Sequence, residues 1–161
     1  MNHEGAPLQP GSSWSAALDT AAQTAQVLGL ALGFGSPLIV AGLMFSGAIP
    51  AGQFWPLETT RQVGYLFTGL VLLAAAWSNW RSGQVLAGFK NLQAGQRAPV
   101  LLRETLIYAV LSELSCILGL VYWVVAGVTA ARHAWGFVLL TPLLSLAIVP
   151  RKARWKQALE G

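Results

Sequence analysis

Four long runs of apolar residues, separated by polar connections, organise this chain. A helix needs about 20 residues, at roughly 1.5 Å each, to cross about 30 Å of hydrocarbon. The first and third runs exceed that length, and the shorter second and fourth are flanked by tryptophans, which favour membrane interfaces. The pattern predicts an all-α membrane protein with four transmembrane helices in an up-down bundle. The expected spans are about 27–49, 63–80, 106–128 and 134–149.

The segments outside these runs differ in length and character. Residues 1–26 are expected to form an N-terminal tail, whose Ala-rich second half either continues the first helix or lies along the membrane surface. The connection 129–133 is short enough to place the last two helices in an antiparallel hairpin. Apolar residues at helical spacing predict that the second helix continues past the membrane until Gly95 and Pro99 end it. Residues 150–161 are expected to form a basic C-terminal tail.

Composition supports the membrane class, and charge gives an orientation. Hydrophobic residues are 55% of the 161 and charged residues only 10%, whereas soluble domains carry about a quarter charged. With four crossings, the two tails and the middle connection share one side. The excess of Lys and Arg on that side predicts that both termini lie in the cytoplasm. The basic residues expected there are Arg81, Lys90, Arg97, Arg103, Arg151, Lys152, Arg154 and Lys156, against Arg61 and Arg132 on the other side.

These basic residues also indicate a partner. Lys and Arg next to a membrane attract anionic lipid headgroups by about 1 kcal/mol each. Nucleic-acid binding is not expected, because no basic stripe with interleaved aromatic residues forms a separate soluble domain.

Small residues predict where helices approach closely. Gly29, Gly33 and Ser36 recur at three- and four-residue spacing in the first span, and Pro37 follows, where a kink is expected. This face is a candidate for self-association. A second stripe of small residues in the third span contains Ala109, Ser112, Cys116 and Gly119.

Glu113 is the one ionisable side chain deep inside an apolar run. A carboxyl group in hydrocarbon is costly unless it is protonated, paired or hydrogen-bonded, so it is a candidate intramembrane proton site. Residues at its depth offer the hydroxyls of Ser36, Thr141 and Ser145 but no countercharge, so we expect a protonated group at neutral pH. Three interpretations stay open: a hydrogen bond that joins helices, reversible binding of a proton or cation, and pairing with another subunit.

Motifs for chemistry are not expected. Cys116 is the single cysteine, and His3 and His133 are not at metal-binding spacing, so no metal site, cofactor or disulfide is predicted. One Glu with Ser and Thr in the bilayer forms no nucleophile-base pair, which argues against an enzyme.

The stretch 88–125 resembles the polar loop and second helix of the rotary ATP synthase proteolipid, the c subunit. Glu113, Ile117 and Gly119 occupy the spacing of the proteolipid carboxylate, apolar residue and glycine, and Arg103 lies near the start of the span. The preceding helix has only Gly69 in place of the proteolipid glycine repeat. The resemblance therefore implies proton binding at Glu113 and not a rotary ring.

The whole chain resembles small four-span bacterial inner-membrane proteins of unassigned function that carry a Glu-x-x-x-Ile-x-Gly hairpin and end in a Pro-Arg-basic tail, here Pro150 and Arg151. Two functions follow as hypotheses. The first is a structural or accessory subunit that packs against other membrane subunits or against copies of itself. The alternative is a small proton-coupled transporter or ion-translocating subunit that uses Glu113.

The charge asymmetry makes a topological prediction. Reporter fusions placed after Gly161 should report a cytoplasmic C-terminus, because the basic residues of the middle connection and the C-terminal tail resist translocation. An external reporter would contradict the orientation.

Overall fold

The computed structural model describes residues 14–160, and every regular element in that range is helical, which confirms the all-α prediction. The part of the expected N-terminal tail before residue 14, with His3, lies outside the described residues. The elements are α1 (Ala16–Leu30), the π-helix η1 (Ala31–Gly35), α2 (Ser36–Phe45), α3 (Leu57–Phe89), α4 (Ala94–Ala126), the 3-10 helix η2 (Gly127–Ala130), α5 (Ala131–Ile148) and α6 (Lys152–Glu160).

Three helical segments in the described chain are long and apolar enough to cross a membrane, so the expected count of four is not matched. The three segments are Ala16–Phe45, Leu57–Phe89 and Ala94–Glu160. The reason is η2, which joins α4 to α5 with no irregular residue between them. The expected third and fourth spans therefore belong to one segment, in which α5 packs alongside α4.

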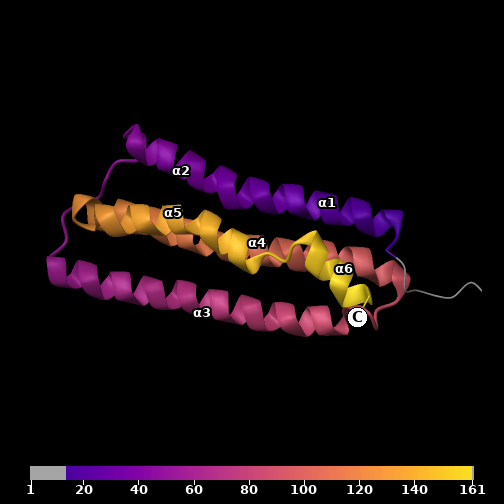
Figure 1. The fold of residues 1–161 in the computed structure, drawn as a ribbon. Helices are drawn as coiled ribbons and strands as arrows, with labels where there is room; N and C mark the ends of the chain where they lie inside the picture. The colour runs from indigo at the N-terminus through magenta and orange to yellow at the C-terminus, as the bar shows by residue number, and fades with distance from the viewer. Residues whose placement is uncertain (1–13, 161) are drawn as a thin grey trace, which may run out of the picture.

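The helices form three layers (Figure 1). α4 and α5 lie side by side in the middle, α1 and α2 cover one side, and α3 covers the other. The start of α1, the α3–α4 connection and α6 lie together at one end, which we call the basic end. The α2–α3 connection and η2 lie at the opposite end. This arrangement leaves α6 in contact with both outer layers, since it packs against α1 and α3.

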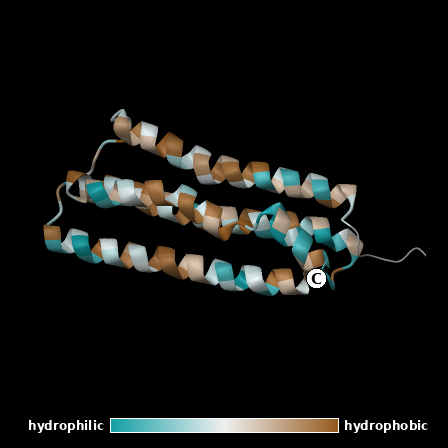
Figure 2. Ribbon diagram, viewed as in Figure 1, coloured by the Kyte–Doolittle hydropathy of each residue, from teal (hydrophilic) through white to brown (hydrophobic). Residues whose placement is uncertain are grey.

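Apolar side chains line much of the outside of the molecule. Figure 2 shows hydrophobic residues along the helices, and large ones such as Leu38 on α2, Leu73 on α3 and Leu143 on α5 are exposed. Apolar surface of this extent promotes aggregation in water and is typical of a surface that contacts lipid or another protein.

The first apolar helix changes its winding just before Pro37. Proline has no N–H to give to the carbonyl of Gly33, so the α-helical hydrogen-bond ladder is interrupted there. The chain accommodates the interruption with the π-helical turn η1 directly ahead of Ser36. A π-helical segment thus precedes the position where a kink was expected.

The reversal between α4 and α5 requires a glycine. Gly127 has a positive φ of 63°, and a Cβ at this position would overlap the carbonyl of Gly52 in the α2–α3 connection. The indole of Trp123 holds the same connection, because its Nε1 donates to the carbonyl of Ile49 at 3.0 Å. These contacts fix the end of the molecule opposite α6.

The expected end of the second apolar helix is wrong. α3 stops at Phe89, and Gly95 and Pro99 lie inside α4 instead of ending the preceding helix. The turn is stabilised by Arg97, whose guanidinium donates to the carbonyls of Lys90 at 3.1 Å and Leu92 at 3.0 Å. A side-chain cap of this kind satisfies carbonyls that a helix end leaves open.

The C-terminal segment 150–161 is more than a basic tail. Its helix α6 buries Trp155 and Leu159, which lie one turn apart, and leaves Arg154 and Lys156 exposed. The Trp155 ring packs edge-on against Phe89 with centroids 4.9 Å apart. α6 therefore packs its apolar side against the other helices at the basic end and leaves its basic side exposed.

The contact between the first apolar helix and α5 can be tested at Gly33. A Cβ there would overlap the side chain of Ser145, whereas one at Gly35 would meet nothing within 4 Å. Gly33→Ala should lower the free energy of unfolding in detergent by about 1–3 kcal/mol, as overpacking does. Gly35→Ala is the matched control and should stay near wild type. Equal thermal unfolding midpoints for the two variants would contradict this packing.

Candidate functional site

Glu113 contacts the first apolar helix. Its carboxyl group lies on α4 and is 8% exposed, and Ser36 at the start of α2 donates a hydrogen bond from Oγ to Oε2. Of the three expected hydroxyl partners, the structure brings this one to the carboxyl group. The contact joins residues from two layers of the fold, so it serves the packing of the first apolar helix on α4.

The other two expected partners do not bond to Glu113. Thr141 on α5 donates to the carbonyl of Phe137 in its own helix at 3.3 Å. Ser145 faces Gly33. Both hydroxyls lie on α5, whereas the carboxyl group of Glu113 reaches toward α2.

The second oxygen of the Glu113 carboxyl group accepts no hydrogen bond from the described residues. This oxygen, Oε1, is buried. No Lys or Arg side chain forms an ion pair with Glu113 in the described chain. An apolar surrounding with a single hydroxyl donor disfavours a charge, which is the environment that a neutral carboxylic acid requires.

The predicted small-residue stripes pack within the chain. A Cβ at Gly29 would lie 3.7 Å from the side chain of Val149, and Gly33 faces α5 as well. On α4, a Cβ at Gly119 would come within 2.8 Å of the carbonyl of Ala134 on α5. The Gly29 and Gly33 face is therefore occupied by α5, so it is not available for the self-association considered from the sequence. Ser112 and Cys116 are also buried, and Ser112 donates to the carbonyl of Ala109 at 2.7 Å.

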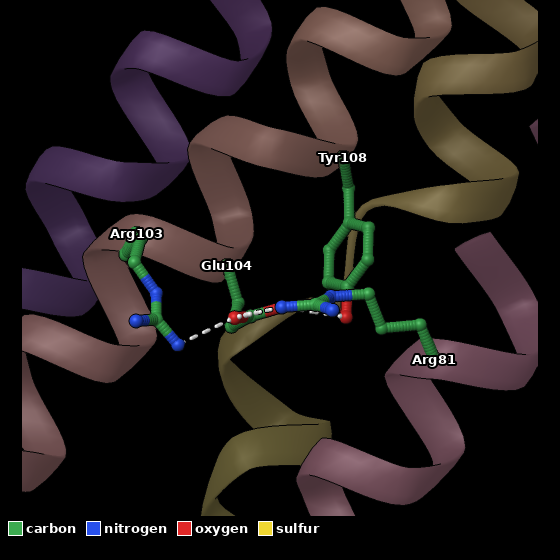
Figure 3. Close-up of polar contacts among 4 residues, drawn as sticks. All are labelled: Arg81, Arg103, Glu104 and Tyr108. Carbon is green, nitrogen blue, oxygen red and sulfur yellow. Dashed lines mark hydrogen bonds and ion pairs between the residues drawn. The ribbon is translucent and has the colours of Figure 1, made fainter.

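A second carboxylate, Glu104, lies in a polar cluster with Arg81, Arg103 and Tyr108 (Figure 3). Glu104 on α4 is fully buried, and Arg81 on α3 donates to it twice, from Nε to Oε2 and from Nη2 to Oε1, both at 2.8 Å. Arg103 donates to Oε1 at 3.0 Å, and the Tyr108 hydroxyl donates to Oε2 at 3.2 Å. Bidentate arginine bonds of this kind are among the stronger ones in proteins.

The Arg81–Glu104 pair ties α3 to the middle layer. The Arg81 guanidinium also lies over the Trp77 ring, 5.3 Å from its centroid. The cluster was not predicted from the sequence, because Glu104 lies just outside the apolar run and its basic neighbours are typical of a solvated loop. The available signal was an acidic residue among basic ones at the end of one span, with an arginine at the same end of the preceding span.

The residues expected to form a cytoplasmic basic set have different surroundings. Arg97 is 5% exposed and caps the α3–α4 turn, so its guanidinium is directed into the protein. Arg103 is exposed for most of its length although it contacts Glu104. Lys152 pairs with Asp19 on α1 at 2.5 Å. Three further members of the set are exposed: Arg151, Arg154 and Lys156.

Among residues 14–160, no group of three or more His, Cys, Asp and Glu side chains is placed to hold a metal ion. No protein-family model matches the chain, and neither a curated protein nor a solved structure is significantly similar to it.

The Arg81–Glu104 pair makes a testable contribution to stability. Arg81→Met should lower the free energy of unfolding in detergent by about 3–5 kcal/mol, because it leaves a buried carboxylate short of its main partner. Adding Glu104→Leu should recover much of that loss, since apolar replacement of a whole buried pair is often close to neutral. Arg61→Met is the control, because Arg61 is exposed and its guanidinium bonds to Tyr65 on its own helix. A double variant no more stable than Arg81→Met would contradict the pairing.

Proposed function

We propose that the chain is an integral protein of a bacterial inner membrane, which it crosses four times with both termini in the cytoplasm. Three long apolar segments support the membrane location, and the third contains two helices that pack side by side, which supports four crossings. The basic end carries most of the Lys and Arg residues, as the cytoplasmic end of such a protein does.

Within that membrane, we propose a structural or accessory role in a larger complex or homo-oligomer. The observation that carries the proposal is the engagement of Glu113, the one carboxyl group deep in an apolar run, by Ser36 at a helix contact. Residues that could have relayed a proton or cation, Thr141 and Ser145, are directed elsewhere. The polar groups of the spans thus hold helices together, and the apolar outer faces are left for lipids or partner subunits.

A proton-coupled function is the alternative, and one observation favours it. The unpartnered Oε1 of Glu113 is a buried acceptor that a bound proton or a cation would satisfy. The resemblance of 88–125 to the proteolipid implies the same role for this side chain. A four-helix protein of this kind would need another subunit to complete a path across the membrane.

Substitutions at Glu113 separate the two functions. In the structural role, Glu113→Gln keeps an acceptor for Ser36, so abundance, folding and the partners recovered in mild detergent should match wild type. Glu113→Leu should lower the free energy of unfolding by about 1 kcal/mol through loss of one hydrogen bond. Ser36→Ala is the matched control and should show a similar loss.

The alternative has a different signature. A proton-binding Glu113 should react with a hydrophobic carbodiimide in a pH-dependent way, and Glu113→Gln should abolish proton-coupled transport while the protein stays folded. That result, obtained with wild-type stability and the same recovered partners, would overturn the structural role.

A further inference from the structure

A cavity of about 90 Å³ lies between α1, α4, α5 and α6, toward the basic end of the molecule. One water needs roughly 10–15 Å³ of such space, so the cavity has room for several waters or for one tetrahedral oxyanion. Glu113 and Ser36 do not line it. It is therefore a separate feature from the intramembrane carboxyl group.

Two of the three buried side-chain atoms without a partner in the described chain belong to residues that line this cavity. They are Oγ1 of Thr105 on α4 and Nε1 of Trp155 on α6, and these side chains are 2% and 1% exposed. A buried polar group without a hydrogen bond destabilises the fold, so such groups in native proteins normally have a partner. Both residues border one cavity, and an occupant that reached these two atoms would satisfy them.

The lining also indicates the chemistry of that occupant. The indole N–H of Trp155 is a donor only, and the Thr105 hydroxyl can donate as well. Arg151 and Lys152 line the same cavity, and none of the lining residues is acidic. Lys152 also pairs with Asp19 on α1, which lies outside the lining, so Arg151 brings the positive charge that no carboxylate offsets in the described chain. Donors and cations without a carboxylate favour an anion with several acceptor oxygens. Gln26 and Ser145 add polar side chains to the lining, and Leu30, Leu146 and Val149 form an apolar part of the wall.

We propose that this cavity binds a phosphate group, with its oxygens accepting hydrogen bonds from Trp155 and Thr105 and its charge offset by Arg151. The apolar wall favours an anionic phospholipid as the source, because an acyl chain would lie against Leu146 and Val149. The inference rests on the proposed membrane location. It adds a defined lipid site to the general attraction between basic residues and headgroups.

The experiment compares two cavity variants with two matched controls. Thr105→Val removes the hydroxyl at nearly constant volume, and Trp155→Phe removes the N–H but keeps an aromatic ring. Thr68→Val and Trp80→Phe make the same changes outside the cavity. Delipidated protein in detergent is titrated with phosphatidylglycerol and observed by native mass spectrometry, and inorganic phosphate is tested separately by its effect on the thermal midpoint.

We expect each cavity variant to bind the first phosphatidylglycerol roughly tenfold more weakly than wild type, as loss of one charge-assisted hydrogen bond implies. The controls should bind as wild type does, and inorganic phosphate should leave the wild-type midpoint unchanged. If phosphate stabilises the wild type but neither cavity variant, while lipid binding is equal in all, the site takes free phosphate and the lipid source is overturned. Equal lipid and phosphate responses in all five proteins would overturn the site itself.

Two checks keep the result interpretable. Thermal unfolding of each variant shows whether it folds, and if Trp155→Phe loses α6 packing, the near-isosteric Thr105→Val carries the test. Extraction of membranes with alkaline carbonate is done first. Release of the chain would contradict the proposed membrane location, whereas a retained chain with unchanged variants would contradict only the phosphate site.

Discussion

The close contact of α4 with α5 is the packing on which the rest of the fold depends. In an apolar surrounding there is little hydrophobic drive between helices, so their association relies on small residues that let backbones approach. Gly119 provides that approach, because a side chain there would collide with the backbone of α5. The reversal at Gly127 brings α5 back along α4. α1 and α2 then pack on one side of this pair and α3 packs on the other. The first apolar helix then packs on this pair through Gly29 and Gly33.

Hydrogen bonds join α4 to its neighbouring helices at three positions along its length. Tyr122 donates to the carbonyl of Thr60 near the end opposite α6, and Ser36 donates to Glu113 between the first apolar helix and α4. Glu104 accepts from Arg81 toward the basic end. Each bond joins α4 to an outer layer, so α4 is the helix through which the bundle is connected. This distribution is the physical reason to regard the carboxyl groups first as elements of helix association.

The basic end differs from the rest because two of its buried polar atoms have no hydrogen-bond partner among residues 14–160. Trp155 fills the space between α1, α3 and α4 with its ring, and both Trp155 and Thr105 line a cavity. The same end carries the cations of α6. A packed apolar cluster beside unsatisfied donors and positive charge is the combination that a headgroup site would require, and it arises only because α6 folds back onto the other helices.

The sequence alone determined the class of the protein, since periodicity, composition and hydropathy specify long apolar helices whatever their arrangement. It also identified Glu113 and included Ser36 among its candidate partners, because depth along a span can be counted in residues. Tertiary structure decided the rest. Spacing could not show that Thr141 and Ser145 turn away from Glu113, that Arg97 caps a turn, or that Glu104 is buried against Arg81. Those outcomes depend on how helices rotate against one another, and that rotation is set by contacts between residues far apart in the chain.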